Sequence, residues 1–219
     1  MVLLNYMDFS KNQKGGLRMN IDSLVETIKE SMNSFRENEL AYLSMTGKNE
    51  LLIRDRIAYE LYSKYSNYII SREYNPSGVK SRIDLAILEN GKIKDIIELK
   101  SVYTFDSADM RNYINAINKD FNKNSELVID GVNQYEIIIA THIKEVPNEE
   151  FKDCVKYYRL IKKYLNNIEY SNILVEDLDY IIKKEFSEEK YEIRKFKVTA
   201  GQSFGVNVDV WFWILKNNK

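Results

Sequence analysis

The feature of this sequence that most constrains its fold is a pair of apolar segments on either side of Asn90-Gly91. Segments 82–88 and 93–99 are rich in Ile, Leu and Ala. Asn-Gly between two such segments is the strongest short-range signal for a tight turn that joins antiparallel strands. The sequence therefore predicts a β-hairpin here, with strands apolar enough to lie inside a covered sheet.

Helical and strand-like patterns alternate along the rest of the chain. Apolar residues spaced three and four apart predict helices, and runs rich in Val, Ile and Tyr predict strands. Asn20 and Asn49 are expected to cap the first two helices, and Gly47 ends the first of them. The predicted helices span residues 21–45, 50–65, 107–123, 148–165 and 175–184, and the other predicted strands span 68–74, 135–140, 191–199 and 204–215, with turns at 75–78 and 200–203.

This order of elements predicts an α/β fold in which a mixed β-sheet is flanked by helices. The 219 residues fit a single domain, 1–219, that buries a core without disulfides or metals. Residues 1–19 are interpreted as an arm, and residues 20–45 as an additional N-terminal helix. The strands after residue 190 are expected to form a closing hairpin.

Charge and composition exclude several classes of protein. Lys and Arg total 32 against 33 for Asp and Glu, so the chain is no polycation, although a local basic cleft is compatible with this balance. Cys154 and His142 are the single residues of their kinds, which excludes a disulfide framework, a cysteine-built zinc site and mechanisms that need paired histidines. Both are interpreted as structural.

No apolar run reaches the length of about 18 residues that a membrane span requires. Residues 1–9 have neither the basic leader nor the long apolar stretch of a signal peptide. A cytoplasmic protein without membrane partners is therefore expected.

Ionisable residues inside the two hairpin strands are the best candidates for a functional site. Asp84 lies in the first strand, and Glu98 and Lys100 lie at the end of the second. A buried carboxylate without a partner costs several kcal/mol, so charges kept in such strands usually have counter-charges, a metal or a function. Strand alternation places Glu98 and Lys100 on one face of the sheet.

The register of the hairpin decides whether Asp84 joins that face. A two-residue turn pairs Asp84 with Ile97 and points Asp84 to the opposite face. A three-residue loop, with Gly91 in the left-handed conformation, pairs Asp84 with Ile96 and makes it a diagonal neighbour of Glu98. A functional site therefore requires the longer loop or a β-bulge.

These residues resemble the PD-(D/E)XK phosphodiesterase superfamily, the restriction endonuclease-like nucleases. Asp84 is followed fourteen positions later by Glu98-Leu99-Lys100, and Glu50 is the acidic residue on a preceding helix. The resemblance covers residues 49–141, which would be the catalytic core, and leaves residues 145–219 as a C-terminal elaboration. Ile83 stands where the family name has Pro.

The resemblance implies a magnesium-dependent endonuclease of the restriction or defence type that hydrolyses DNA, with Mn²⁺ as a substitute ion. Asp84, Glu98 and the backbone carbonyl of Leu99 would bind the metal, which takes oxygen ligands and retains several waters. Lys100 would orient the attacking water and stabilise negative charge. Glu50 would hold a second ion or a metal-bound water.

Plainer interpretations of the same residues remain open. Asp84, Glu98 and Lys100 also fit a cross-strand ion-pair cluster on a half-exposed sheet. Glu50 also fits a carboxylate at a helix N-terminus that pairs with Arg54 four residues later. Glu60 on the same helix and Glu73 on the first strand compete with Glu50 for its role. The second function considered is a non-catalytic subunit of the same fold that binds nucleic acid or a protein.

Possible DNA contacts are basic or aromatic. Arg72 and Arg82 could contact phosphate or form salt bridges between strands. A row of cations on the predicted helix 148–165 could follow a DNA backbone or be a solvated face. Segment 211–213, Trp-Phe-Trp, could stack on bases or pack in the core. The residues of the row are Lys152, Lys156, Arg159, Lys162 and Lys163.

Cleavage of both strands of a duplex would imply a homodimer, because one such site hydrolyses one strand. The C-terminal strands and the N-terminal helix are the predicted dimer surfaces. A separate partner subunit that reads the target sequence is compatible with the sequence.

Overall fold

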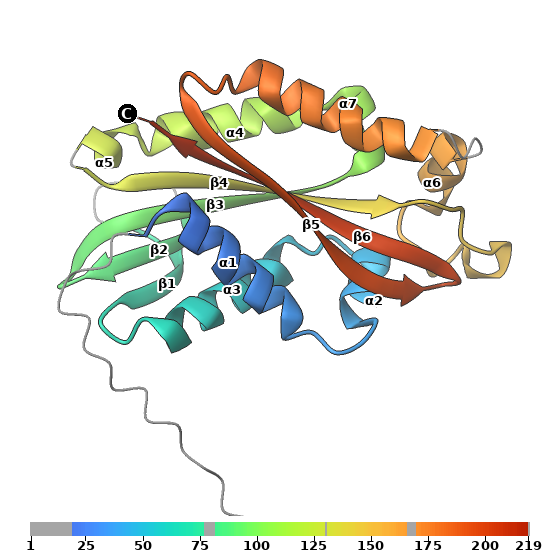
Figure 1. Cartoon of the computed structure of the whole chain (residues 1–219), viewed down its shortest axis with the longest axis horizontal. Coiled ribbons are helices and arrows are strands. Elements are labelled where there is room, and N and C mark those ends of the chain that lie inside the picture. Colours follow the sequence, from blue (N-terminus) through green and yellow to red (C-terminus); the bar gives the residue numbers. More distant parts are fainter. Residues whose placement is uncertain (1–18, 77–81, 130, 166–169, 219) are drawn as a thin grey trace, which may run out of the picture.

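The computed structural model describes residues 19–76, 82–129, 131–165 and 170–218. Within these residues the chain forms one sheet of six strands with helices on both faces (Figure 1). The predicted α/β class and the flanked mixed sheet are confirmed. Most of the predicted arm and the Ser77-Gly78 half of the predicted turn lie outside the described residues.

The sheet has the strand order β1-β2-β3-β4-β6-β5. β3 and β4 are parallel, and all other neighbours are antiparallel. The parallel pair needs a crossover connection, which the residues between β3 and β4 supply as a helix. The strands are β1 (Ile69–Tyr74), β2 (Ile83–Glu89), β3 (Lys92–Tyr103), β4 (Asn133–Ile143), β5 (Tyr191–Ser203) and β6 (Val206–Asn217).

Helices cover the two faces of the sheet in separate layers. Figure 1 shows α1, α2 and α3 on one face and α4 and α7 on the other. Each layer closes an apolar core, one built around Ile57, Leu99 and Phe212 and the other around Ile117 and Ile138. The helices are α1 (Ile21–Asn33), α2 (Glu39–Thr46), α3 (Glu50–Lys64), α4 (Arg111–Lys123), α5 (Ser125–Ile129), α6 (Tyr158–Leu165) and α7 (Tyr170–Glu185), with 3₁₀ turns η1 (Thr104–Asp109) and η2 (Glu149–Phe151).

The predicted N-terminal helix 21–45 is wrong in one respect, because it is two helices. Asn20 caps α1 as expected, and its side-chain oxygen accepts the Ser23 N–H at 2.8 Å. The chain then turns at Asn38, whose φ of 63° is left-handed and cannot continue a helix. The Asn38 side chain accepts the backbone N–H of Gln202 at 2.7 Å, which fixes this turn against β5.

The predicted C-terminal elements also differ in their limits. Helix 148–165 is wrong over its first half, where only η2 and turns form, because Tyr157 has a φ of 62° and interrupts the helix before α6. Helix 175–184 is longer than predicted and becomes α7. The last hairpin turns at Phe204-Gly205 rather than at 200–203, which instead extend β5 across a bulge.

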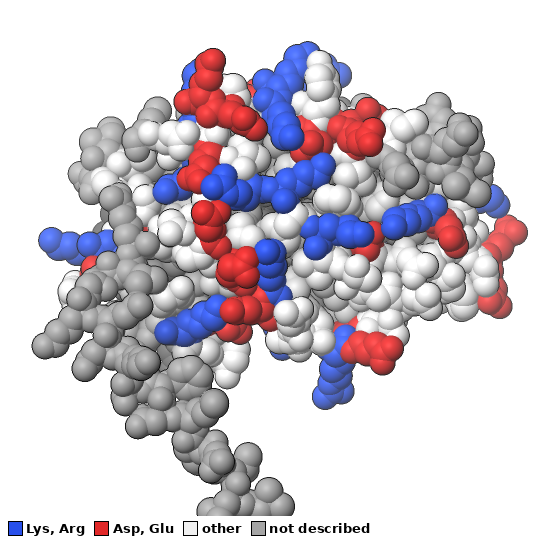
Figure 2. All heavy atoms as spheres, viewed as in Figure 1, with Lys and Arg blue, Asp and Glu red and all other residues white. Residues whose placement is uncertain are grey.

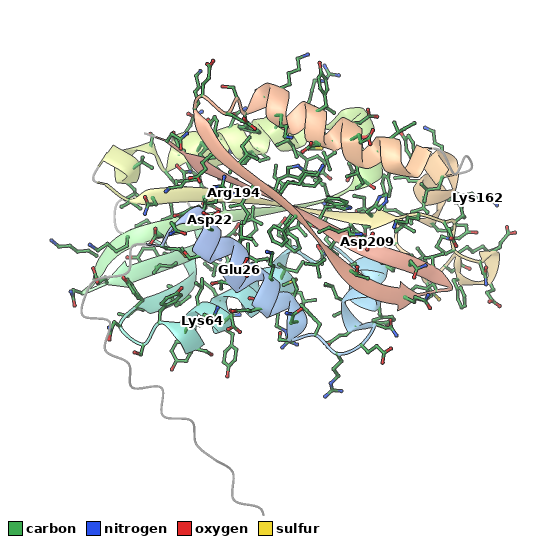
Figure 3. All side chains as sticks on the ribbon, in the orientation of Figure 1. Asp22, Glu26, Lys64, Lys162, Arg194 and Asp209 are labelled. Carbon is green, nitrogen blue, oxygen red and sulfur yellow. The ribbon has the colours of Figure 1, made fainter. Side chains whose placement is uncertain are left out.

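The edge strand β5 is tied to the first helical layer by an ion pair. Arg194 of β5 and Asp22 of α1 are 2.8 Å apart and lie together in Figure 3.

None of the helices in the described ranges is long and apolar enough to cross a membrane.

The contact between Asn38 and β5 predicts a position-specific effect of glycine replacement. Gly201 has a φ of +105°, and a Cβ there would lie 3.0 Å from the Asn38 Cα. Gly201→Ala should lower the free energy of unfolding by about 2 kcal/mol or more, because backbone strain and a steric clash add together. Chemical denaturation with Gly91→Ala as the control measures this. Gly91 has a φ of +75° but open space around it, so it should lose only about 1 kcal/mol; equal losses would contradict the clash.

Candidate active site

The β2–β3 hairpin changes its register part-way along its length. Glu89 pairs with Lys92, so the turn at Asn90-Gly91 has two residues. Leu85, however, pairs with Ile97, because the register shifts by one residue beyond Leu88. Of the two arrangements that a functional site requires here, the three-residue loop is not formed and the β-bulge is.

The bulge brings Asp84 and Glu98 together. The register after the shift, continued by one residue, sets Asp84 directly opposite Glu98, where side chains share one face of the sheet. The backbone nitrogen of Asp84 lies 3.4 Å from Oε2 of Glu98. The Leu99 N–H donates to Oδ2 of Asp84 at 2.8 Å. Each of the two carboxylates thus contacts the backbone of the opposite strand where β2 begins.

Glu50 approaches the same edge of β3 from the start of α3. Its Oε2 accepts the backbone N–H of Ser101 at 2.8 Å, two residues beyond the N–H that Asp84 accepts. The N–H and C=O of one strand residue point to the same edge. The Leu99 carbonyl therefore points to the edge where Asp84 and Glu50 are bound, and Lys100 Nζ donates to it at 3.1 Å.

Glu50 differs in its contacts from Glu73, one of the two residues that compete with it for the same role. Burial raises the pKa of the Glu50 carboxyl, while the Ser101 N–H and the charge of Lys100 oppose this rise. Arg54 forms ion pairs with Asp55 and Glu73, so the predicted alternative pair between Glu50 and Arg54 is not formed. Glu73 therefore forms an ion pair with Arg54 and does not take the place of Glu50 at the site.

Glu60, the other competitor, is remote from the site. It follows Glu50 by ten residues on α3. At 1.5 Å per residue this separation is about 15 Å along the helix axis. Glu60 is therefore a suitable control position for Glu50.

Lys100 is held by an acidic residue in the last turn of α4. Its Nζ lies 2.6 Å from Oδ2 of Asp120. Burial lowers the pKa of the Lys100 ammonium, but the hydrogen bond and charge of Asp120 outweigh burial and raise it overall. Lys100 therefore remains charged, and 22% of its side chain stays accessible.

Glu98 is held by the last residue of α4 and by the C-cap residue that follows it. Oε1 of Glu98 accepts from Lys123 Nζ at 2.9 Å and from Asn124 Nδ2 at 3.1 Å. Burial raises the pKa of Glu98 to about 7, with Lys123 opposing the rise and Asp84 adding to it. Asp120, Lys123 and Asn124 are not among the sequence-predicted site residues. Their spacing of three and four positions places them on one helix face, which is the signal that could have identified them.

Glu136 of β4 adds a third acidic residue beneath α4. It pairs with Glu98 in the parallel register and is completely buried. Neither of its side-chain oxygens has a hydrogen-bond partner among the described residues. Burial, followed by the charges of Asp120 and Glu98, raises its pKa well above the ordinary value, so this side chain is a neutral acid over part of the pH range in which free glutamate is charged. A lone Glu within the apolar segment 135–140 was the sequence signal for it.

The donor set at this edge suits a small hard cation. In the described part of the chain, no group of three or more His, Cys, Asp or Glu side chains is close enough to hold a metal ion. The candidate ligands are instead two carboxylates, Asp84 and Glu98, with the carbonyl of Leu99. Magnesium commonly takes one or two carboxylates and completes its shell with water and substrate oxygens. The contact of Lys100 with the Leu99 carbonyl indicates that this oxygen attracts positive charge.

The predicted nucleic-acid contacts are only partly gathered near the site. Arg72 is exposed and pairs with Asp55 at 2.7 Å, and Arg82 is exposed and lies 3.9 Å from Glu73. Cations and acids are interspersed on the face that Figure 2 shows, without a broad basic surface. A pocket beside α6 collects most of the predicted row of cations together with two acids. Its lining residues are Glu149, Lys152, Asp153, Tyr158, Arg159, Lys162 and Lys163.

Three other residues are placed as packing or surface groups. Lys156 Nζ lies 5.3 Å from the ring centroid of Tyr157, outside the residues that line the pocket. Trp213 is fully buried, and its indole N–H donates to Asp179 at 2.8 Å, so it packs in the core. His142 is buried beside Thr104, and burial lowers its pKa to about 4.

Comparison of this chain with protein-family models, curated proteins and solved structures found no match. The functional assignment therefore depends on the geometry of the site.

The neutral state of Glu136 predicts a pH-dependent effect of its replacement. Because its folded-state pKa lies above its unfolded value, the stability that its protonated form contributes is present at acidic pH. That stability is lost as pH rises from the unfolded pKa through the folded one. Glu136→Gln keeps the shape without the charge, so its melting temperature should rise relative to wild type between pH 5 and pH 8.5. Thermal denaturation checks this.

Glu145→Gln is the matched control, because Glu145 is an exposed glutamate near the end of β4. Its melting temperature relative to wild type should stay constant over the same pH range. A Glu136→Gln difference that is flat, or that falls with pH, would show that Glu136 is not held neutral.

Proposed function

We propose that this chain is a metal-dependent endonuclease of the PD-(D/E)XK type that hydrolyses phosphodiester bonds in DNA. The observation that carries the proposal is the meeting of Asp84 and Glu98 across the β-bulge, with Glu50 and Lys100 at the same stretch of β3. The order α3-β1-β2-β3-α4-β4 agrees with the order of elements expected for a restriction endonuclease-like core.

Each residue of the site has a distinct role in the proposed reaction. Asp84, Oε2 of Glu98 and the Leu99 carbonyl would hold Mg²⁺, with Mn²⁺ as a substitute. The bound ion would neutralise charge on the scissile phosphate and lower the pKa of an attacking water. Lys100 stays protonated beside Leu99, where its ammonium would orient the water and stabilise negative charge. Glu50, which is bound to Ser101, would accept a hydrogen bond from a metal-bound water.

The substrate would reach the site from the side of β3 that β2 leaves uncovered. Arg72 and Arg82 are exposed near the start of β2 and are the proposed phosphate contacts closest to Asp84 in the sheet. The pocket beside α6 is a second proposed contact, through Arg159 and Lys163. Lys156, which precedes α6 in the chain, is a third proposed contact. Because cations and acids alternate at these places, duplex binding should be weak and strongly salt-dependent.

We also propose a cytoplasmic location, because the chain has only one cysteine. If the enzyme cuts both strands, we propose that it acts as a homodimer. Edge strand β5 carries four charged residues in its first half, Glu192, Arg194, Lys195 and Lys197. Charged edges oppose strand-to-strand pairing between molecules. The first helical layer is therefore the better proposed dimer surface.

One observation favours the second candidate function, a non-catalytic subunit that binds nucleic acid or a protein. Lys100 and Lys123 already neutralise Asp120 and Glu98, so the polar cluster is stable as an ion-pair network without a metal. A cleavage assay distinguishes this possibility from a nuclease.

Cleavage of supercoiled plasmid and of single-stranded DNA in Mg²⁺ or Mn²⁺ tests the proposed function. Wild type should nick or linearise DNA, and a chelator should abolish this. Asp84→Asn and Lys100→Met should each lower the rate by about 10²-fold or more, because each removes a charge that acts on the transition state. Glu50→Gln should lower it measurably.

Glu60→Gln is the control for Glu50→Gln, because it changes the same helix away from the site. It should cleave like wild type. Cleavage that survives both Asp84→Asn and Lys100→Met would refute the site. DNA binding without cleavage in any metal would support the non-catalytic alternative.

A further inference from the structure

The ammonium group of Lys123 on α4 is surrounded by protein oxygens, as a bound cation would be, rather than mainly by solvent. Its Nζ lies 2.9 Å from Oε1 of Glu98, 2.8 Å from Oδ1 of Asp120 and 3.3 Å from the carbonyl oxygen of Arg82. An ammonium group has three protons to donate, and these three oxygens match that number. Only 20% of the side chain is exposed. Lys123 therefore lies in a cage of two carboxylates and one backbone carbonyl.

This cage has the same chemical composition as the proposed metal site. The proposed metal ligands are also two carboxylates and one backbone carbonyl, namely Asp84, Glu98 and Leu99. Glu98 belongs to both sets and divides its oxygens between them. Oε1 is bound by Lys123 and by Asn124, and Oε2 is the oxygen nearest the Asp84 backbone.

The charges around Glu98 are consistent with one fixed cation on this side. Burial lowers the pKa of Lys123, but the hydrogen bonds that it donates to Asp120 and Glu98 outweigh burial and raise the pKa overall, so the group stays charged. A divalent ion on Oε1 would have to displace this ammonium from two carboxylates. Separating a largely buried lysine from its partners leaves an uncompensated charge, which is costly.

We propose that Lys123 takes the place of a second metal ion, so that the site binds one divalent cation and uses a lysine ammonium as the other positive charge. This inference rests on the proposed function, because it assumes the ion at Asp84 and Glu98. Two-metal sites in nucleases place both ions on shared carboxylates. Here Glu98 is the shared carboxylate, and the second position is filled from within the chain.

The number of Mn²⁺ ions bound by the full chain, counted by electron paramagnetic resonance, tests the proposal without a cleavage assay. Wild type should bind one ion. Lys123→Ala vacates the cage and restores a net negative charge to Glu98 and Asp120, so it should bind two. Lys123→Arg keeps the charge and should bind one. Lys119→Ala, which removes an exposed lysine from the same helix, is the matched control and should also bind one.

The outcomes separate this inference from the proposed function. Two ions bound to wild type, or one ion bound to Lys123→Ala with unchanged affinity, would overturn the role of Lys123 and leave the nuclease proposal intact. No ion bound to wild type at millimolar Mn²⁺ would overturn the metal site itself, and the inference with it. Lys123→Gln, a second variant that removes the charge but keeps part of the side chain, should also bind two ions, and it decides the role of Lys123 if Lys123→Ala folds poorly.

Discussion

One β-bulge in the β2–β3 hairpin determines how the rest of the site is arranged. Without it, the two-residue turn would place Asp84 and Glu98 on opposite faces of the sheet, because side chains alternate along a strand. With it, the two residues are opposite each other on neighbouring strands. The same register ends the pairing of β2 before Leu99 and Ser101, so their N–H groups are available to Asp84 and Glu50. A one-residue irregularity thus supplies both the acidic pair and an accessible strand edge.

The second determinant is α4, the crossover helix that the parallel β3–β4 pair requires. The last turn of α4 and its C-cap residue place Asp120, Lys123 and Asn124 above β3, where they bind Lys100 and Glu98. These contacts compensate charges that would otherwise be costly to bury. They also select which oxygen of Glu98 faces Asp84. The contacts that hold α4 against the sheet therefore also orient the site residues.

The sequence predicted the fold class and a hairpin that turns at Asn90-Gly91, because these follow from local patterns of polarity and turn chemistry. It did not predict which register the hairpin adopts, because a bulge is set by packing on both faces rather than by residue type. Asn38 and Tyr157 interrupt predicted helices through left-handed backbone conformations that tertiary contacts stabilise. The α4 residues and Glu136 were not predicted for a similar reason, since a contact between a helix and a strand depends on tertiary structure. Asp84, Glu98 and Lys100 were selected from the sequence because charges are rare in such apolar strands, whereas Glu50 was selected only through the family resemblance.

Asp84, Glu98 and the Leu99 carbonyl are together the proposed ligands of a divalent cation. Anomalous diffraction from a crystal soaked in Mn²⁺ tests this proposal most directly, because it locates the ion independently of turnover. We expect a single anomalous peak within bonding distance, about 2–2.5 Å, of oxygens from all three residues. A crystal with no peak at β3, or with a peak bound only by other carboxylates, would contradict it.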